Sequence, residues 1–191
     1  MNHMHLEKKG LRGLAIAESF KQGDNFSRLA GVVIRRDFII DGFVFGRCTV
    51  EGDDATDAIL GMYSRLNRDD ISYIIISGLV ISMYNIIDIK KIWERTKIPV
   101  IGVTFEDSGG IEDAIRRHFP NSYESKLEQY NKLGKRTEIT LHTGYKLYLR
   151  HEGCPLEEAK KFLDLVTLRG SVPEPIKVAQ LLAKASLGFG P

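Results

Sequence analysis

The stretch "IIISGLVISMYNIID", residues 74–88, decides the fold prediction for this chain. It begins inside the apolar run "ISYIIIS" (71–77), which is typical of a central strand that is covered on both faces. Ser77 and Gly78 end that strand, and a polar loop would ordinarily follow. The chain instead stays largely apolar as far as Met83, so we expect this loop to be buried.

The neighbouring segments predict a mixed sheet. The next stretch, "NIIDIKKIWERTK" (85–97), has helical character and leads to the apolar run "VIGVTF" (100–105). This strand–helix–strand spacing predicts a parallel crossover unit. Three strand-like runs precede it, at residues 11–20, 29–36 and 38–52, and their short separations predict an antiparallel meander.

The remaining segments place helices on both sides of this sheet. Apolar residues recur with helical spacing from Ala55 to Leu66, which predicts an amphipathic helix. We then expect two helices, a hairpin and two closing helices, at residues 109–119, 122–134, 137–150, 155–169 and 173–185. Three antiparallel strands followed by parallel strands, with helices on both faces, predict an α/β fold of the ribonuclease-H-like type.

Length and composition restrict the class of protein. The chain has 191 residues, of which 43% are hydrophobic and 27% are charged, as in an ordinary globular protein. We expect a flexible segment over residues 1–10 and one domain over residues 11–191. The net charge is only +2, so a nucleic-acid partner would need a local basic patch. We expect a cytoplasmic protein without a membrane partner, since neither a membrane-spanning run nor a signal-peptide stretch is recognisable.

Five segments carry a resemblance to a known family. They occur in one order along the chain: LRGLAIAESF, VEGDDATDAI, IIISGLVISMYNIIDI, IPVIGVTFED and TLRGSVPEPIKVAQLLAKA. Together they closely resemble the DUF99 or UPF0215 family, which is mainly archaeal and uncharacterised, over about residues 11–187. That family is distantly similar to endonuclease V, which has a ribonuclease-H-like fold and uses a divalent metal to cut nucleic acid near deaminated purines.

The resemblance to endonuclease V implies carboxylates at the ends of adjacent central strands, where they hold Mg²⁺ or Mn²⁺. The first expected aspartate falls at Ala17, with Glu18 after it, and the second falls at Ser77. Alanine provides no ligand, and a neutral hydroxyl is a poor substitute for a carboxylate. Neighbouring strand residues point to opposite faces, so Glu18 replaces Ala17 only if the strand end bends. Glu18 is therefore the main candidate for a metal ligand at these strand ends.

Other candidate residues have both a functional and a structural interpretation. Asn85 and Asp88 either bind a substrate or cap the helix that follows them. The resemblance also implies an acid near the first helix, although acids in a first turn are often only helix caps. The candidates for this acid are Glu51, Asp53, Asp54 and Asp57.

Three further positions remain open. Glu174 either belongs to the site or only begins the closing helix. Arg169 either holds a phosphate or pairs with an acid. Tyr84 either stacks on a base or anchors the apolar loop. A set of basic residues also offers phosphate contacts or is simply a solvated face: Lys132, Lys135 and Arg136, with Arg116, Arg117 and His118.

We therefore keep two main hypotheses. In the first, an endonuclease V-like protein acts on nucleic acid, with cleavage in doubt because Ala17 and Ser77 replace aspartates. Its candidate catalytic residues are Glu18, Ser77 and Glu174, and its candidate binding residues are Tyr84, Asn85, Asp88 and Arg169. In the second, a non-catalytic module keeps the nuclease fold and binds nucleic acid or protein. A small-molecule site at the strand ends is a third alternative, and a homo-oligomer is compatible with each of these hypotheses.

Overall fold

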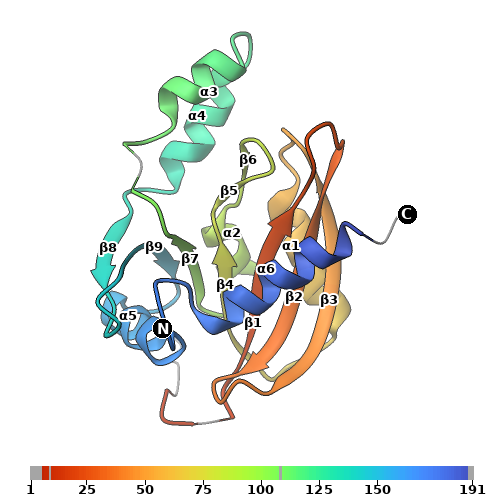
Figure 1. Cartoon of the computed structure of the whole chain (residues 1–191). Helices are drawn as coiled ribbons and strands as arrows, with labels where there is room; N and C mark the ends of the chain where they lie inside the picture. The colour runs from red at the N-terminus through yellow and green to blue at the C-terminus, as the bar shows by residue number, and fades with distance from the viewer. Residues whose placement is uncertain (1–5, 9, 108, 189–191) are drawn as a thin grey trace.

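The described part of the chain is built around one seven-stranded mixed sheet (Figure 1). The computed structural model describes residues 6–8, 10–107 and 109–188. The first three strands are β1 (Arg12–Ser19), β2 (Phe26–Arg35) and β3 (Ile40–Thr49). They pair as an antiparallel meander, which confirms the prediction.

The second half of the sheet begins with the predicted crossover. β4 (Ile71–Ser77), α2 (Ile89–Thr96) and β7 (Val100–Thr104) follow one another, and β4 is parallel to both β1 and β7. β9 (Lys146–Glu152) runs antiparallel to β7, with β8 (Thr137–Thr140) beside it at the edge. The strand order is β3-β2-β1-β4-β7-β9-β8, so the three parallel strands occupy the centre.

Helices cover both faces of the sheet, as predicted. α1 (Ala55–Leu66) and α2 pack on one face, here called the α1 face, where Ile59 of α1 is fully buried. α5 (Leu156–Leu165) and α6 (Glu174–Ser186) pack on the other, here called the α6 face, where Phe162 is fully buried. The apolar alternation of the central strands therefore fills two separate cores.

A helical hairpin stands beyond the carboxyl ends of the central strands (Figure 1). It consists of α3 (Glu112–His118) and α4 (Tyr123–Lys132). Lys126 of α4 is only 5% exposed. Its Nζ donates to Asp53 Oδ1 at 2.7 Å and to the carbonyl oxygen of Tyr84 at 3.1 Å. This lysine therefore fastens the helical hairpin to the loop before α1 and to the turn at residues 82–84.

The prediction that a helix begins at Asn85 is wrong. Residues Asn85–Ile86 form β6, which pairs with β5 (Val80–Ile81) as a separate antiparallel ribbon. α2 begins only at Ile89, after Asp88, whose side chain accepts a hydrogen bond of 2.9 Å from the backbone N–H of Lys91. Helical periodicity could not reveal this boundary, because the Asn85 side chain is held by distant parts of the chain.

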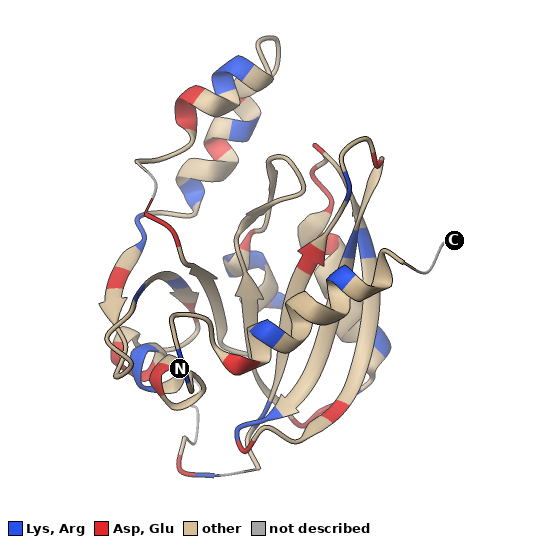
Figure 2. Cartoon of the chain, in the orientation of Figure 1, with Lys and Arg blue, Asp and Glu red and all other residues tan. Residues whose placement is uncertain are grey.

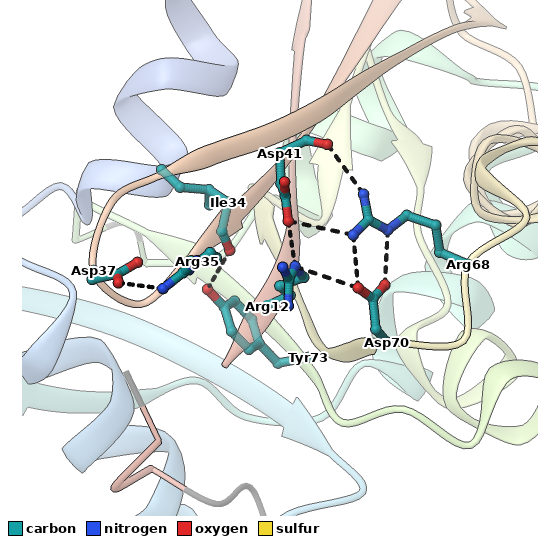
Figure 3. Close-up of polar contacts among 8 residues, drawn as sticks. All are labelled: Arg12, Ile34, Arg35, Asp37, Asp41, Arg68, Asp70 and Tyr73. Atoms are coloured by element: carbon teal, nitrogen blue, oxygen red, sulfur yellow. Dashed lines mark hydrogen bonds and ion pairs between the residues drawn. The ribbon is translucent and has the colours of Figure 1, made fainter. Parts of the chain in front are cut away.

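Charged side chains at the amino end of β1 pair with one another (Figure 3). Arg12 donates to Asp41 and lies 3.3 Å from Asp70. Arg68 donates to Asp70 through Nε and Nη2, each at 2.7 Å. The hydrogen bond from Arg12 lowers the pKa of the Asp41 carboxyl below its ordinary value. These four residues satisfy one another at the end of the sheet opposite to the carboxyl ends of β1 and β4.

The predicted flexible segment at residues 1–10 falls only partly within the described structure. Residues 1–5 and 9 lie outside the described residues. Leu6 is 7% exposed and belongs to the core of the α6 face. The flexibility of this segment stays a prediction. Within the ranges that the structure describes, no helix is long and apolar enough to cross a membrane.

Candidate functional site

The carboxyl ends of β1 and β4 meet where the resemblance implies an active site. Ile16 pairs with Ile76 in parallel register, so the next residues, Ala17 and Ser77, lie side by side on the α6 face. Ala17 is 2% exposed within that core. Ser77 Oγ accepts a hydrogen bond of 3.0 Å from Nε2 of Gln180 on α6. An amide, not a carboxylate, therefore faces these strand ends.

These residues do not fit a site for Mg²⁺ or Mn²⁺. Such ions take hard oxygen ligands, carboxylates above all, whereas Ala17 has no donor atom and Ser77 is neutral. Glu174 begins α6 six residues before Gln180, about 9 Å away along the helix axis. Its carboxylate accepts a hydrogen bond of 2.5 Å from Lys177. Among the residues that the structure describes, no group of three or more His, Cys, Asp or Glu could hold a metal ion.

Glu18 points to the α1 face, opposite to Ala17. Its carboxylate accepts hydrogen bonds from the Ser27 hydroxyl and, at 3.2 Å, from the backbone N–H of Ser82. Both serines are buried, at 0% and 1% exposure. The Ser82 hydroxyl also lies 3.3 Å from Cys48 Sγ, and burial raises the pKa of that thiol to about 11. Glu18 thus joins β1, β2 and the β5–β6 ribbon.

The turn of the β5–β6 ribbon has an unusual backbone. Ser82, Met83 and Tyr84 have φ values of 47°, 56° and 70°, in the left-handed region that non-glycine residues seldom adopt. Tertiary contacts hold it there, since Glu51 N–H donates to the Ser82 carbonyl at 2.8 Å and Lys126 donates to that of Tyr84. Met83 is 42% exposed. Three consecutive residues of this kind make the turn a candidate for function.

Tyr84 contacts the helical hairpin. Its ring centroid lies 5.0 Å from that of His118 and 5.7 Å from that of Phe119. His118 Nε2 in turn lies 2.8 Å from Glu51 Oε1, beside the start of α1. These contacts favour the interpretation that Tyr84 is an anchor, although it anchors the ribbon to the hairpin and not to the core.

Asn85 secures the start of α1. It is fully buried, its Oδ1 accepts from Ala55 N–H at 3.1 Å, and its amide donates to Asp54 at 2.8 Å. Thr49 N–H also donates to Asp54, at 2.9 Å. Burial raises the pKa of Asp54, but the hydrogen bonds from Thr49 and Asn85 outweigh this effect and lower it overall. Both side chains therefore serve the fold.

The other candidate residues are dispersed. Asp88 caps α2. Arg169 lies exposed between α5 and α6, and its backbone carbonyl accepts from Lys177 Nζ at 3.1 Å. The acids that begin α1 are paired as follows: Glu51 with His118, Asp53 with Lys126, Asp54 with Thr49 and Asp57 with Lys91. No hydrogen bond within the described ranges joins Asp88 or Arg169 to Glu18 or Ser77.

A cleft of about 400 Å³ opens at the carboxyl ends of the strands. Its wall includes Glu18, the ribbon turn at residues 82–84, Tyr130, Arg136 and Arg150. Arg136 lies over the ring of Tyr148 at 5.0 Å, and Arg150 over that of Tyr130 at 5.7 Å. Figure 2 shows acidic and basic residues mixed along the adjoining helical hairpin. Arg136 Nη2 also lies 3.8 Å from Asp107 Oδ1, and Glu18 lines the same cleft.

Sequence reasoning singled out Arg136 but missed Arg150 and Tyr130. Arg150 lies in the segment "YKLYLR", where it has the alternating pattern of an ordinary residue in the predicted β-hairpin at 137–150. Tyr130 lies on the predicted helix at 122–134 and has no distinctive spacing. The pairing of β9 with β7 places Arg150, and the docking of α4 brings Tyr130 to it.

Comparisons with known proteins agree with this architecture. A UPF0215 protein of Pyrobaculum calidifontis is 42% identical over 171 residues, which cover 89% of this chain and 93% of the relative. A solved Archaeoglobus fulgidus protein of unknown function superposes with a TM-score of 0.78 and 26% identity, covering 92% of this chain and 97% of that one.

Endonuclease V shows the fold at a greater distance. The Ciona intestinalis enzyme, solved in complex with DNA that contains an inosine, has a TM-score of 0.59 and 14% identity, covering 93% of this chain and 85% of that one. The predicted ribonuclease-H-like fold is therefore confirmed. The sequence pattern of the family described as Endonuclease dU matches residues 9–187. This chain belongs to the Endonuclease dU family, as its curated UPF0215 relatives and its fold also indicate.

Proposed function

We propose that this protein binds nucleic acid in the cleft at the carboxyl ends of its central strands, and that it does not cut by the two-metal route of endonuclease V. The observation that carries this proposal is the pair Ala17 and Ser77, which are neighbours in the sheet and face the amide of Gln180. A divalent ion would find no carboxylate there, while the cleft beside them keeps features suited to binding.

The two arginines of the cleft support a phosphate contact. Arg150 Nε donates to the carbonyl oxygen of Gly134 at 2.8 Å, and Arg136 Nη1 donates to that of Glu106 at 3.2 Å. Each guanidinium also lies against a tyrosine ring, which limits its motion. Arg136 Nη2 also lies 3.8 Å from Asp107 Oδ1, so Arg150 is the main candidate to direct N–H groups toward phosphate oxygens. Lys135, in the adjoining hollow, adds a further positive charge.

The ribbon turn supplies an apolar element opposite these cations. Met83 is 42% exposed in a backbone conformation that costs free energy, and the contacts of its neighbours with Glu51 and Lys126 offset that cost. An unbranched thioether side chain adapts to flat surfaces of different shape. Cations on one side and an adaptable apolar side chain on the other suit a strand whose bases are unpaired.

Binding and cleavage can be measured separately. Fluorescence anisotropy with single-stranded DNA that contains deoxyuridine or inosine, and with unmodified DNA and RNA, is expected to show binding in EDTA. Arg150→Gln should weaken this binding about tenfold. It should also reduce the slope of log affinity against log salt concentration by about 1, the loss of one phosphate contact. The matched control is Lys146→Gln, on the same strand but outside the cleft, which should leave the affinity unchanged.

Cleavage of the same oligonucleotides is then followed in Mg²⁺ and Mn²⁺. We expect none. Metal-dependent cleavage by the wild type that is lost in Glu18→Gln would overturn the non-cutting part of the proposal. Absence of binding to every oligonucleotide would overturn the nucleic-acid part and leave the alternative, a module that binds a protein partner.

A further inference from the structure

The outer edge of β3 carries aromatic side chains. Side chains next to it already occupy part of its backbone: Arg65 donates to the Phe45 carbonyl, Arg68 donates to the Asp41 carbonyl, and Asp54 accepts from Thr49 N–H. β3 has ten residues and is the last strand on its side of the sheet. We propose that this edge pairs antiparallel with β3 of a second copy of the chain, which would give a two-fold symmetric dimer with one continuous sheet. The inference is independent of the proposed nucleic-acid function.

The α6 face leaves β3 uncovered. α6 packs mainly against β1 and β2, and Figure 1 shows it crossing this side of the sheet. Phe43 and Phe45, on β3, are 51% and 50% exposed, and Phe26 on β2 is 47% exposed. Soluble proteins usually protect long edges with charges, proline or brevity. The opposite edge, β8, has four residues and its Glu138 pairs with Lys146. β3 is longer, and its charges, Asp41 and Arg47, only flank the aromatic positions.

The backbone groups of this edge point outward at the aromatic positions. Val50 N–H donates to the carbonyl of Asn25 at 3.0 Å. In an antiparallel pair such bonded positions alternate, so β3 bonds to β2 through its even-numbered residues from Val44 onward. The odd-numbered residues therefore direct N–H and C=O away from the sheet. The Phe45 carbonyl agrees with this direction, because its oxygen accepts a hydrogen bond of 2.6 Å from the Arg65 side chain of α1. The second lone pair of this oxygen is left for a partner strand.

The sequence of this edge matches itself when it is reversed. Residues 42–46 read GFVFG, centred on Val44. A two-fold interface requires residue i to face residue j and the reverse. In an antiparallel pair centred on Val44, Phe43 faces Phe45 of the partner subunit and Phe45 faces Phe43 of the partner subunit. The outward N–H and C=O groups of these residues are then in register for hydrogen bonds. Aromatic pairs of this kind stabilise antiparallel strands.

The flanking charges are also complementary about the same centre. Asp41 and Arg47 stand three residues on either side of Val44, so each lies near its opposite in the partner subunit. The effect on stability is small because Asp41 already pairs with Arg12 and Arg68 within its own chain. It nevertheless favours the antiparallel register and a second copy over an unrelated partner.

The apolar area fits a modest interface. Each phenylalanine side chain can bury about 200 Å², so the three half-exposed rings offer roughly 300 Å² per subunit. That is more than a third of the ~800 Å² that one partner buries in a standard interface. Ile39 and Ile40, at 50% and 44% exposure, extend the same edge. Backbone pairing of two edges adds to this area.

Sedimentation equilibrium of the full chain tests the proposal. The monomer has a mass of 21.5 kDa, and we expect a reversible species of twice that mass at concentrations of tens of micromolar. Phe43→Lys combined with Phe45→Lys should weaken the dimer at least 30-fold. The control is Tyr145→Lys, which replaces an aromatic residue of 58% exposure in the β8–β9 turn and should leave the dimer unchanged. Circular dichroism checks that both variants fold.

Disulfide trapping tests the register. Phe43→Cys combined with Phe45→Cys should give a covalent dimer under mild oxidation, because these positions face each other across the two-fold axis. Either single replacement should trap poorly, since each cysteine would face a phenylalanine. A wild type that stays monomeric at about 100 μM, or a dimer that persists in the double lysine variant, would overturn the proposal. Equal trapping by the single variants would overturn the register.

Discussion

The two faces of the sheet differ at the end of β1 by a single step along the strand. On the α6 face, Ala17 lies beside Ser77, and the polar contact there is a neutral hydroxyl with the Gln180 amide. On the α1 face, Glu18 is a charged acceptor for Ser27 and Ser82. The difference teaches that an acid next to an expected ligand position is not a substitute for that ligand. A strand turns its next side chain through the sheet, where Glu18 serves another purpose.

The largest test restores carboxylates to the α6 face. Ala17→Asp combined with Ser77→Asp places two acids on adjacent parallel strands about 4.8 Å apart, within reach of one ion. We expect the variant to be destabilised without metal and restabilised by Mn²⁺, by about 3 kcal/mol at a hundredfold excess over Kd. Thermal unfolding with and without Mn²⁺ measures this. An equal response of the wild type would contradict our interpretation of the strand ends.

The second test removes the acid from the α1 face. Glu18→Ala removes the carboxylate that accepts from the Ser82 N–H and leaves the buried Ser27 hydroxyl only the Ser19 carbonyl, at 3.3 Å. We therefore expect a loss of about 2 kcal/mol in the free energy of unfolding. Glu18→Gln keeps one acceptor oxygen and should lose less. Denaturant unfolding gives both values. A change below about 0.5 kcal/mol in Glu18→Ala would mean that Glu18 is not a structural acceptor.

The third test uses pH on the same α1 face. The pKa of Asp54 is lowered overall, because hydrogen bonds from Thr49 and Asn85 outweigh its burial. A carboxyl with a lowered pKa in the folded state stabilises the protein above its unfolded pKa and loses that effect as pH falls. We therefore expect stability to decline below about pH 4. Asp54→Asn should cost about 1 kcal/mol at neutral pH and make this decline shallower. Unfolding series from pH 3 to 7 would show an unchanged slope if Asp54 contributes nothing.

The smallest expected effect is on the α6 face. Ser77→Ala removes a half-buried hydroxyl whose partner, Gln180, lies on a helix and is itself half-buried. We expect a change of about 0.5 kcal/mol or less in unfolding free energy and no change in oligonucleotide affinity. Loss of binding in this variant would show that the cleft extends to the α6 face, and would make the two faces functionally equivalent.

The fold followed closely from local patterns. The apolar run at residues 71–77, the crossover to residues 100–105 and the short separations of the first three strands predict the observed strand directions. These signals are local, since burial on both faces requires apolar residues at every position of a central strand. The ribbon at residues 80–86 was not predictable, because distant residues hold it: Glu18, Glu51 and Lys126.

The sequence by itself determined the chemistry available at the strand ends. Ala17 and Ser77 provide no carboxylate, whatever surrounds them. Successive side chains of a strand point to opposite faces, so Glu18 lies on the other face from Ala17. Only the tertiary structure decided what those residues meet. Gln180 reaches Ser77 from 103 positions away, Arg150 and Tyr130 meet in the cleft, and β3 becomes an outer edge. Such contacts depend on how distant elements pack, and no local pattern records that.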